Sequence, residues 1–329
     1  MIVIRALQNT GLTVGAILIS LAGAEVALRL AGFPNFLLYD PMYEEAPPPI
    51  TYVLKLNFTG LGRGGIPIRT NSSGMRADRE FEQTPNPDVY RIALIGDSFT
   101  FGHRVVVENT YGAKLEHSLN GTGRGRSWEV LNFGISGYNA QRMVELFKKR
   151  VRHYKPKLVI FSIIHNTFSS GRSRMRFTSP GYITVPGATL SGWPRLQLVL
   201  RRFHVVSAAK LLLTDLSTLI DGMHSRARGP SKEGKYQGDK RREFVQGIKS
   251  ACEEFEGRCV IAFIDLNQTL PSMKLVKGLA LENGIEFWAM DRTGVMPPLS
   301  DIKLDYDYHP NVAGHTFIAS NLYAHITRQ

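Results

Sequence analysis

Five short runs of the chain are apolar at nearly every position, the pattern of strands buried on both faces of a sheet. They span Arg91–Ile95, Trp128–Phe133, Leu158–Ile164, Cys259–Leu266 and Ile285–Met290. Glycine follows each of the first two runs, at Gly96 and Gly134, where it would end a strand. The pattern predicts five strands after residue 90.

Stretches with apolar residues at helical spacing lie between these runs. In Gln141–Tyr154, Met143 and Phe147 fall on one face and Lys148 on the other, which predicts an amphipathic helix. Further helices are predicted over Thr110–Asn120, Arg241–Glu256 and Ser272–Asn283, and from Asn311 onward. The alternation of strand and helix predicts an α/β domain with a parallel sheet covered on both faces.

Residues 167–240 interrupt this alternation. They include a predicted helix at Arg195–Leu213 and carry many basic side chains. We interpret them as an insertion over one edge of the sheet, within a main domain at residues 91–329. Residues 34–90 are interpreted as a linker that passes into an irregular subdomain, because prolines prevent long helices there: Pro34, Pro41, Pro47, Pro48 and Pro49.

The N-terminal segment, residues 1–33, is predicted to be a transmembrane helix. Residues 10–24 are uncharged, and extending this stretch to Leu30 gives 21 residues, close to the ~20 that a bilayer span needs. Glu25 and Arg29 would then lie four residues apart within the span, where they can pair near the interface.

A cleaved signal peptide is the alternative. Arg5 would be its charged region, Gly11–Leu21 its apolar core and Ala22-Gly23-Ala24 its cleavage site. We favour an uncleaved anchor because the apolar pattern resumes at Val26. The expected location is the bacterial inner membrane, with the main domain on the periplasmic or extracytoplasmic side.

Two features suggest interaction surfaces. Small residues form stripes along the N-terminal segment, at which a helix of a membrane-protein partner could pack, although such residues are common in membrane helices: Gly11, Gly15, Ala16, Ser20 and Ala24. The net charge is +12, but residues 141–242 alone carry +16. This basic region is either a solvated face or a surface for anionic lipid or acidic polymer. No zinc-finger or RNA-binding motif points to nucleic acid.

The cysteine count excludes a disulfide-dense scaffold and a Cys-rich zinc module, because the chain has only Cys252 and Cys259. In an oxidising compartment these two could form a disulfide, and two separate buried thiols are the alternative. No His, Asp and Glu cluster has the spacing of metal ligands, so we expect no metal.

Polar residues gather after the predicted strands, where open parallel sheets bind their ligands. Ser98 follows the first strand, Gly137 the second and Asn166 the third, and His309 lies near the C-terminus. This set suits acyl transfer. A serine hydroxyl needs a base such as an imidazole, and the imidazole needs a carboxylate on its other nitrogen, here Asp307 or Asp305.

The tetrahedral intermediate of acyl transfer needs hydrogen-bond donors for its oxyanion. The backbone N–H groups of Ser98 and Gly137 and the side-chain amide of Asn166 are the candidates. Gly137 suits this task because it has no Cβ to block a close approach.

These motifs, in this order, resemble the four blocks of the SGNH (GDSL) hydrolase superfamily. The resemblance covers about residues 70–325, and Asn71–Arg76 resembles the lead-in of membrane-anchored members. It implies a flavodoxin-like three-layer α/β/α sandwich, Ser98 as nucleophile, His309 as base, and an oxyanion hole of Ser98, Gly137 and Asn166. The implied activities are those of esterases, lipases, thioesterases, carbohydrate deacetylases or O-acyltransferases, without a cofactor.

Two blocks depart from the superfamily pattern. The third is usually Gly-x-Asn-Asp and here reads Ile164-His165-Asn166-Thr167. The last is often Asp-x-x-His, but Tyr306 stands at the Asp position. Asp307-Tyr308-His309 instead resembles the Asp-x-His form of alginate-acetylation relatives, which favours Asp307 over Asp305.

Four other polar residues are given non-catalytic roles. We expect His315 to pack or cap a helix, His165 to line the site, His103 to face solvent and Asp97 to form structural hydrogen bonds in the turn before Ser98.

The leading functional hypothesis is a membrane-tethered serine ester hydrolase or O-acyltransferase that acts on an acylated glycan or lipid through Ser98, His309 and Asp307. The alternative is a non-catalytic subunit of a membrane protein complex with the same fold, docked through the transmembrane helix and the basic region. The missing Gly and Asp of the third block motivate this alternative.

Overall fold

A computed structural model describes residues 2–33, 42–62, 65–121, 125–169, 172, 174–178, 182–184, 200, 202–209, 212, 232–268, 271–291, 293–294, 296–305 and 307–327. The chain divides into two compact units. The smaller comprises Met1–Tyr39 and Leu190–Gly229, and the larger comprises Asp40–Thr189 and Pro230–Gln329.

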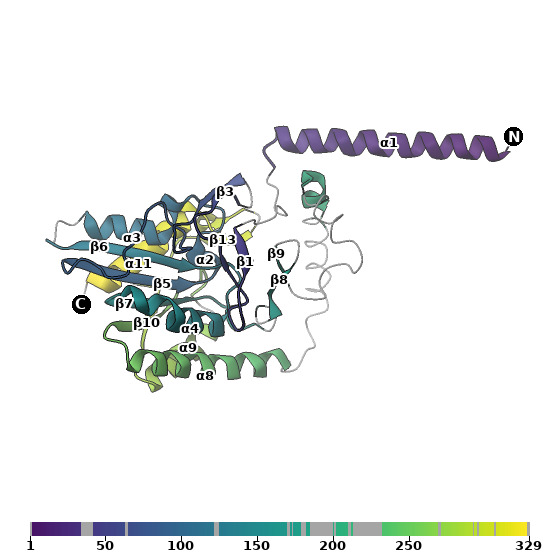
Figure 1. The fold of residues 1–329 in the computed structure, drawn as a ribbon. Coiled ribbons are helices and arrows are strands. Elements are labelled where there is room, and N and C mark those ends of the chain that lie inside the picture. Colours follow the sequence, from purple (N-terminus) through teal and green to yellow (C-terminus); the bar gives the residue numbers. More distant parts are fainter. Residues whose placement is uncertain are drawn as a thin grey trace. The chain divides into compact units, whose positions relative to one another are not determined.

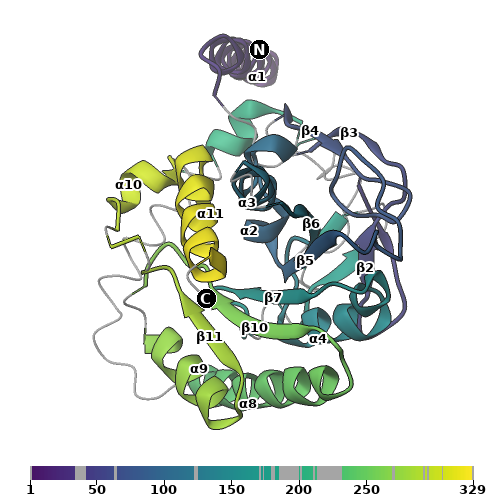
Figure 2. The ribbon, with the colours of Figure 1, turned by 90° about the vertical axis from the view of Figure 1, so that its left-hand side faces the viewer.

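The larger unit is built on a parallel five-stranded sheet, in the spatial order β11-β10-β7-β5-β6 (Figures 1 and 2). The strands are β5 (Val89–Gly96), β6 (Ser127–Gly134), β7 (Leu158–Ile163), β10 (Arg258–Phe263) and β11 (Glu286–Ala289). All five predicted strands are present. The first strand lies between the second and third, which is the flavodoxin-like order, and the chain therefore reverses its direction of winding at β5.

Helices cover both faces of this sheet (Figure 2), which confirms the predicted three-layer α/β/α sandwich. In β5, Ala93 and Ile95 are buried on one face and Ile92 and Leu94 on the other, so the strand is apolar throughout. The first face packs against α4 (Ala140–Lys149), α8 (Lys232–Glu253) and α9 (Pro271–Glu282). The second packs against α3 (Tyr111–Asn120) and α11 (Val312–Thr327).

Two helix boundaries differ from the sequence prediction. The predicted helix Gln141–Tyr154 is α4 followed by a separate 3-10 turn, η3 (Val151–Tyr154). The segment ends at Lys155 in the left-handed conformation, directly before Pro156, which disfavours further helix. Helix α8 begins at Lys232 rather than Arg241. Its first turns are polar, so the hydrophobic pattern did not mark them.

The predicted irregular subdomain contains two small antiparallel hairpins. One pairs β1 (Tyr43–Glu45) with β2 (Tyr52–Leu54), and the other pairs β3 (Thr59–Leu61) with β4 (Pro67–Arg69). Two more hairpins come later in the chain: β8 (Arg176–Thr178) with β9 (Tyr182–Thr184), and β12 (Lys303–Leu304) with β13 (Asp307–Pro310). The remaining short helices are α2 (Ser98–Phe101), η2 (Val107–Asn109) and α10 (Leu299–Ile302).

The Asn71–Arg76 lead-in holds the turn after α2. The Asn71 side-chain oxygen accepts hydrogen bonds from the N–H groups of Ser73 and Met75, which shapes the lead-in. The Arg76 guanidinium is buried and donates to the backbone oxygens of Phe101, Gly102 and Val105. The subdomain before β5 therefore supports the segment in which Ser98 lies.

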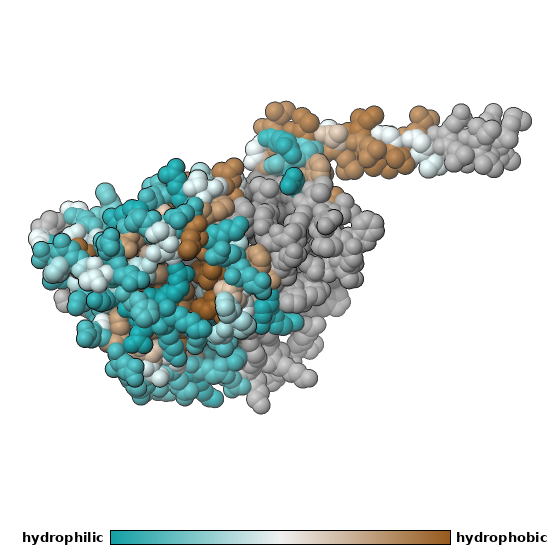
Figure 3. All heavy atoms as spheres, in the orientation of Figure 1, coloured by the Kyte–Doolittle hydropathy of each residue, from teal (hydrophilic) through white to brown (hydrophobic). Residues whose placement is uncertain are grey.

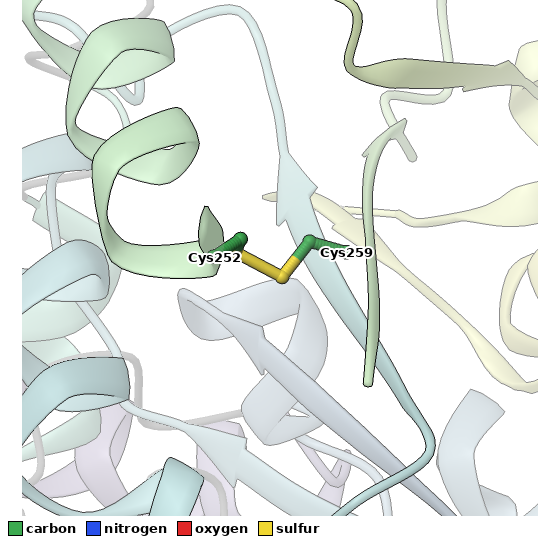
Figure 4. The surroundings of a disulfide bond; sticks show 2 residues. All are labelled: Cys252 and Cys259. Atoms are coloured by element: carbon green, nitrogen blue, oxygen red, sulfur yellow. A yellow bond between two sulfur atoms is a disulfide. The ribbon is translucent and has the colours of Figure 1, made fainter. Parts of the chain in front are cut away.

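A disulfide joins Cys252, in the last turn of α8, to Cys259 in β10 (Figure 4). Of the two states left open by the sequence, the structure contains the bridged one. The bond ties the outer helix layer to the sheet.

The smaller unit contains α1 (Ile2–Leu30), whose apolar surface is visible in Figure 3. Its segment Asn9–Leu30 has 22 residues and a mean hydropathy of 1.9, and by length and composition it can cross a membrane. The predicted ion pair is present, with Arg29 Nε 2.7 Å from Glu25 Oε1. Glu25 also accepts a hydrogen bond from the backbone N–H of Val205.

Much of the predicted insertion, 167–240, lies outside the described residues. Of the predicted helix Arg195–Leu213, the described part includes a helical segment at 204–209. That segment belongs to the same compact unit as α1.

Candidate active site

Ser98 is the first residue of the short helix α2, in a tight turn directly after β5. Asp97 is the N-cap, and its Oδ1 accepts a hydrogen bond from the N–H of Phe99 at 2.9 Å. Gly96 is required here, because a Cβ would lie 1.9 Å from Thr100 Oγ1. This turn sets Ser98 at the carboxyl end of β5, where the winding of the sheet reverses and ligands bind.

His309 lies in β13, and its ring meets Ser98. The distance from His309 Nε2 to Ser98 Oγ is 2.7 Å, although the two residues are 211 positions apart in the chain. When the imidazole proton is on Nδ1, the serine hydroxyl donates to Nε2, which is the arrangement of a nucleophile and its base. The His309 ring also packs against Phe99, at a centroid distance of 5.5 Å.

The predicted oxyanion donors lie at the ends of neighbouring strands. The Ser98 N–H is in the first turn of a helix, where N–H groups have no intrahelical partner. Gly137 has φ +80°, and a Cβ there would lie 2.7 Å from Met175 Cε and from Tyr52 Oη. Both the conformation and the close packing therefore require glycine.

Asn166 lies in the turn that follows β7. Its Oδ1 is buried and has no hydrogen-bond partner among the residues that the structure describes. Thr167, which replaces the Asp of the superfamily pattern, closes the turn: its Oγ1 accepts a hydrogen bond from the Ile164 N–H at 3.0 Å. The chain thus retains an ordered third block without the usual Gly and Asp.

Asp97 forms a buried ion pair as well as capping α2. Arg172 Nη1 lies 2.7 Å from Asp97 Oδ2, and the side chains are 12% and 0% exposed. Arg172 Nη1 also donates to the backbone oxygen of Tyr138 at 2.9 Å. One arginine of the predicted basic region therefore joins the Ser98 turn to the Gly137 turn, and the structural role expected for Asp97 is confirmed.

The choice between the two candidate triad carboxylates stays open. The Asp307 backbone belongs to β13, but its side chain lies outside the described residues. Asp305 is in an exposed turn. Asp307 remains the prediction for the residue that orients His309.

His315 and His103 lie close to this site, and the His103 backbone N–H donates a hydrogen bond to the Ser98 backbone oxygen at 3.0 Å. His315 is buried, and its Nδ1 accepts a hydrogen bond from the Tyr111 N–H at 3.1 Å, the packing and capping role expected for it. Burial, with help from the charge of Arg76, lowers the pKa of His315 to about 3. The prediction that His103 faces solvent holds only in part, because the residue is half-buried and its ring packs against the His309 ring at 4.4 Å.

A second histidine–aspartate pair was not predicted. His165 Nδ1 lies 2.6 Å from Asp265 Oδ2, and the Tyr308 hydroxyl donates to Asp265 Oδ1 at 2.6 Å. Burial opposes ionisation of Asp265, but these hydrogen bonds and two from backbone N–H groups hold the pKa of Asp265 below its ordinary value. The available signal was an acidic residue just beyond an apolar strand.

Most of the chain matches a known protein family. The model of the GDSL-like Lipase/Acylhydrolase family matches residues 94–317. None of the curated proteins compared with the chain matches it.

Solved structures with low sequence identity also match. A two-domain esterase active on acetylated mannans has 14% identity and a TM-score of 0.43, with 73% of this chain covered and 49% of that one. The acetylxylan esterase Axe2 from Geobacillus stearothermophilus has 17% identity and a TM-score of 0.41, with 72% and 94% covered. The chain thus spans about half the length of the first of these proteins.

Proposed function

The chain belongs to the GDSL-like lipase/acylhydrolase family and is a serine hydrolase of the SGNH type, and from this premise we propose that it cleaves esters with Ser98 as nucleophile and His309 as general base. The observation that carries the proposal is the 2.7 Å distance between His309 Nε2 and Ser98 Oγ. A base within hydrogen-bonding reach of the hydroxyl is the first requirement for general base catalysis.

In the first step, His309 Nε2 removes the proton of Ser98 while Oγ bonds to the ester carbonyl carbon. The carbonyl electron pair moves onto its oxygen, and the N–H groups of Ser98 and Gly137 with the amide of Asn166 stabilise this oxyanion. Each such donor contributes about 2.7–4 kcal/mol to the transition state. When the intermediate collapses, the bond to the alcohol oxygen breaks and the alcohol leaves with the proton from His309.

The second step removes the acyl group from Ser98. Water, activated by His309, adds to the acyl carbon, and the same oxyanion donors serve again before the carboxylic acid leaves. An acceptor hydroxyl in place of water would make the reaction an acyl transfer. The two outcomes share every residue above and differ only in what reaches the acyl-enzyme.

The proposed location is the outer side of a membrane, with α1 as an uncleaved anchor. Its apolar segment is long enough to span a bilayer, and the Cys252–Cys259 disulfide suits an oxidising, exported compartment. A cleaved signal sequence would deliver the same domain to the same side. An acylated glycan or lipid near the membrane is the proposed substrate class.

The test is turnover of p-nitrophenyl acetate and labelling by a fluorophosphonate probe, before and after Ser98→Ala. We expect the variant to lose labelling and to lose about 10⁶-fold in kcat, as when an activated serine is removed. Ser118→Ala, at an exposed serine of α3, is the matched control and should change neither. Equal turnover by Ser98→Ala and the wild type would show that Ser98 is not the nucleophile.

A further inference from the structure

The residue before the third oxyanion donor is His165, and its imidazole has one nitrogen bound and one open. Nδ1 lies 2.6 Å from Asp265 Oδ2. The ring is on the surface, with 39% of the His165 side chain exposed, whereas the Asp265 side chain is 0% exposed. Among the residues that the structure describes, none hydrogen-bonds His165 Nε2.

The Asp265 carboxylate fixes this imidazole in one tautomer. It accepts hydrogen bonds from the His165 backbone N–H, the Asn267 backbone N–H and the Tyr308 hydroxyl, in addition to His165 Nδ1. An ionised carboxylate only accepts hydrogen bonds. His165 Nδ1 must therefore carry a proton, so in the imidazole with a single proton the lone pair is on Nε2.

The pair also adjoins the segments that carry the reacting groups. His165 directly precedes Asn166, and its ring stands edge-on to Tyr308 at a centroid distance of 5.4 Å. Tyr308 in turn directly precedes His309. His165 is thus next to the oxyanion donor in the chain, and its ring contacts the residue before the general base.

Resting on the proposed function, we propose that His165 Nε2 accepts a hydrogen bond from a hydroxyl of the alcohol portion of the ester. The alcohol oxygen must approach His309 to take its proton, so the rest of the alcohol lies on the His309 side of the site. A hydroxyl one or two carbons from the ester oxygen is the donor that a neutral imidazole nitrogen binds there. The structure thus assigns a preference for esters of polyols or sugars over esters of simple alcohols.

The surface next to the pair is hollow. A cavity of ≈ 390 Å³ begins at the residues after Asp265, and its lining includes Leu266, Asn267, Gln268 and Met290. The cavity thus begins at the residue after Asp265, whose carboxylate accepts a hydrogen bond from the Asn267 N–H.

The test compares two acetate esters that differ only in hydroxyls, 1-acetylglycerol and propyl acetate, in the wild type and His165→Phe. Phenylalanine keeps a ring against Tyr308 but cannot accept a hydrogen bond. Asp265 loses one donor and keeps three: the backbone N–H groups of residues 165 and 267 and the Tyr308 hydroxyl. We expect kcat/KM for 1-acetylglycerol to fall about three- to tenfold, the effect of one hydrogen bond, while kcat/KM for propyl acetate stays within twofold. His165→Gln offers an amide oxygen in place of Nε2 and should restore most of the difference.

His117→Phe, at an exposed histidine of α3, is the matched control and should leave both values unchanged. An equal loss for the two esters in His165→Phe, or no loss for either, would overturn the role of His165. Ser98-dependent turnover would still stand in that case. If the wild type cleaves neither ester, or Ser98→Ala cleaves both, the proposed function itself is wrong and the role of His165 is refuted with it.

Discussion

Removing the positive charge of Arg172 should destabilise the larger unit, because Asp97 would lose its ion-pair partner. The Asp97 carboxylate is fully buried and lies 2.7 Å from Arg172 Nη1. Its other oxygen accepts a hydrogen bond from the Phe99 N–H at 2.9 Å. The substitution Arg172→Met keeps the length of the side chain and removes the charge and all its donors.

The expected magnitude follows from burial. Breaking a buried ion pair by removing one partner typically costs ~3–5 kcal/mol, because the remaining charge is left uncompensated. In a domain of this size, each kcal/mol shifts Tm by about 2–4 °C, so Tm should fall by ~10 °C. The capped turn that carries Ser98 should also loosen, so esterase activity should fall as well.

A double-variant cycle tests this reasoning by urea unfolding of the larger unit in the full-length protein. The members are the wild type, Arg172→Met, Asp97→Asn and the double variant. Asparagine needs no counter-charge, so the double variant should be more stable than the sum of the single effects predicts, by about 2 kcal/mol or more. Arg174→Met, at an exposed arginine nearby, should have no effect. A coupling free energy near zero would refute the ion pair as a stabilising contact.

Two further substitutions test the site and its pH dependence. Gly137→Ala should lower kcat by ~10²–10³-fold, because the alanine would be strained at φ +80° and would collide with Met175. Both effects would displace the backbone N–H of residue 137, one of the oxyanion donors. Steady-state kinetics with p-nitrophenyl acetate measures kcat, and an unchanged value would argue against this donor. The pKa of His315 is lowered to about 3 in the folded protein, against about 6.5 when unfolded. The folding stability that depends on the neutral His315 is therefore complete above about pH 6.5 and is lost as the pH falls toward about 3. At pH 5 this lowers the free energy of unfolding by about 2 kcal/mol. His315→Asn can still accept a hydrogen bond from the Tyr111 N–H, and it should reduce the acid-dependent loss of unfolding free energy, measured with urea, by that amount. An unchanged pH profile in His315→Asn would contradict the assignment, and His117→Asn is the control.

The sheet was predictable from the sequence because each of its strands is buried on both faces. Such strands are continuous apolar runs, as in β5 and β7, and they need no knowledge of distant partners to be identified. The approach of Ser98, Gly137 and Asn166 followed from the same rule, because the ends of parallel strands meet at one edge of the sheet. The pairing of His309 with Ser98 came instead from the chemistry of acyl transfer and from the resemblance to SGNH hydrolases, because β13 lies outside this sheet.

Contacts that depend on a distant charged partner could not be predicted. Arg172 counted only as one more cation in a basic region, and nothing in its local sequence marks it as buried beside Asp97. Asp265 lies 100 residues from His165, and a single acidic residue after a strand carries no local indication of its partner. Pattern and spacing report which face a residue occupies, whereas ion pairs depend on how separate loops meet.

The contacts of Arg76 have a practical consequence for trimming the gene. Its guanidinium donates hydrogen bonds to three backbone oxygens at and just after the end of the Ser98 helix. An N-terminal deletion reaching Arg91 would therefore remove the donor of those carbonyls. A shortened, detergent-free version intended for assays or crystals should therefore start ahead of Tyr43, retaining both early hairpins. Cutting at the first long strand instead is expected to yield a protein that precipitates or lacks turnover.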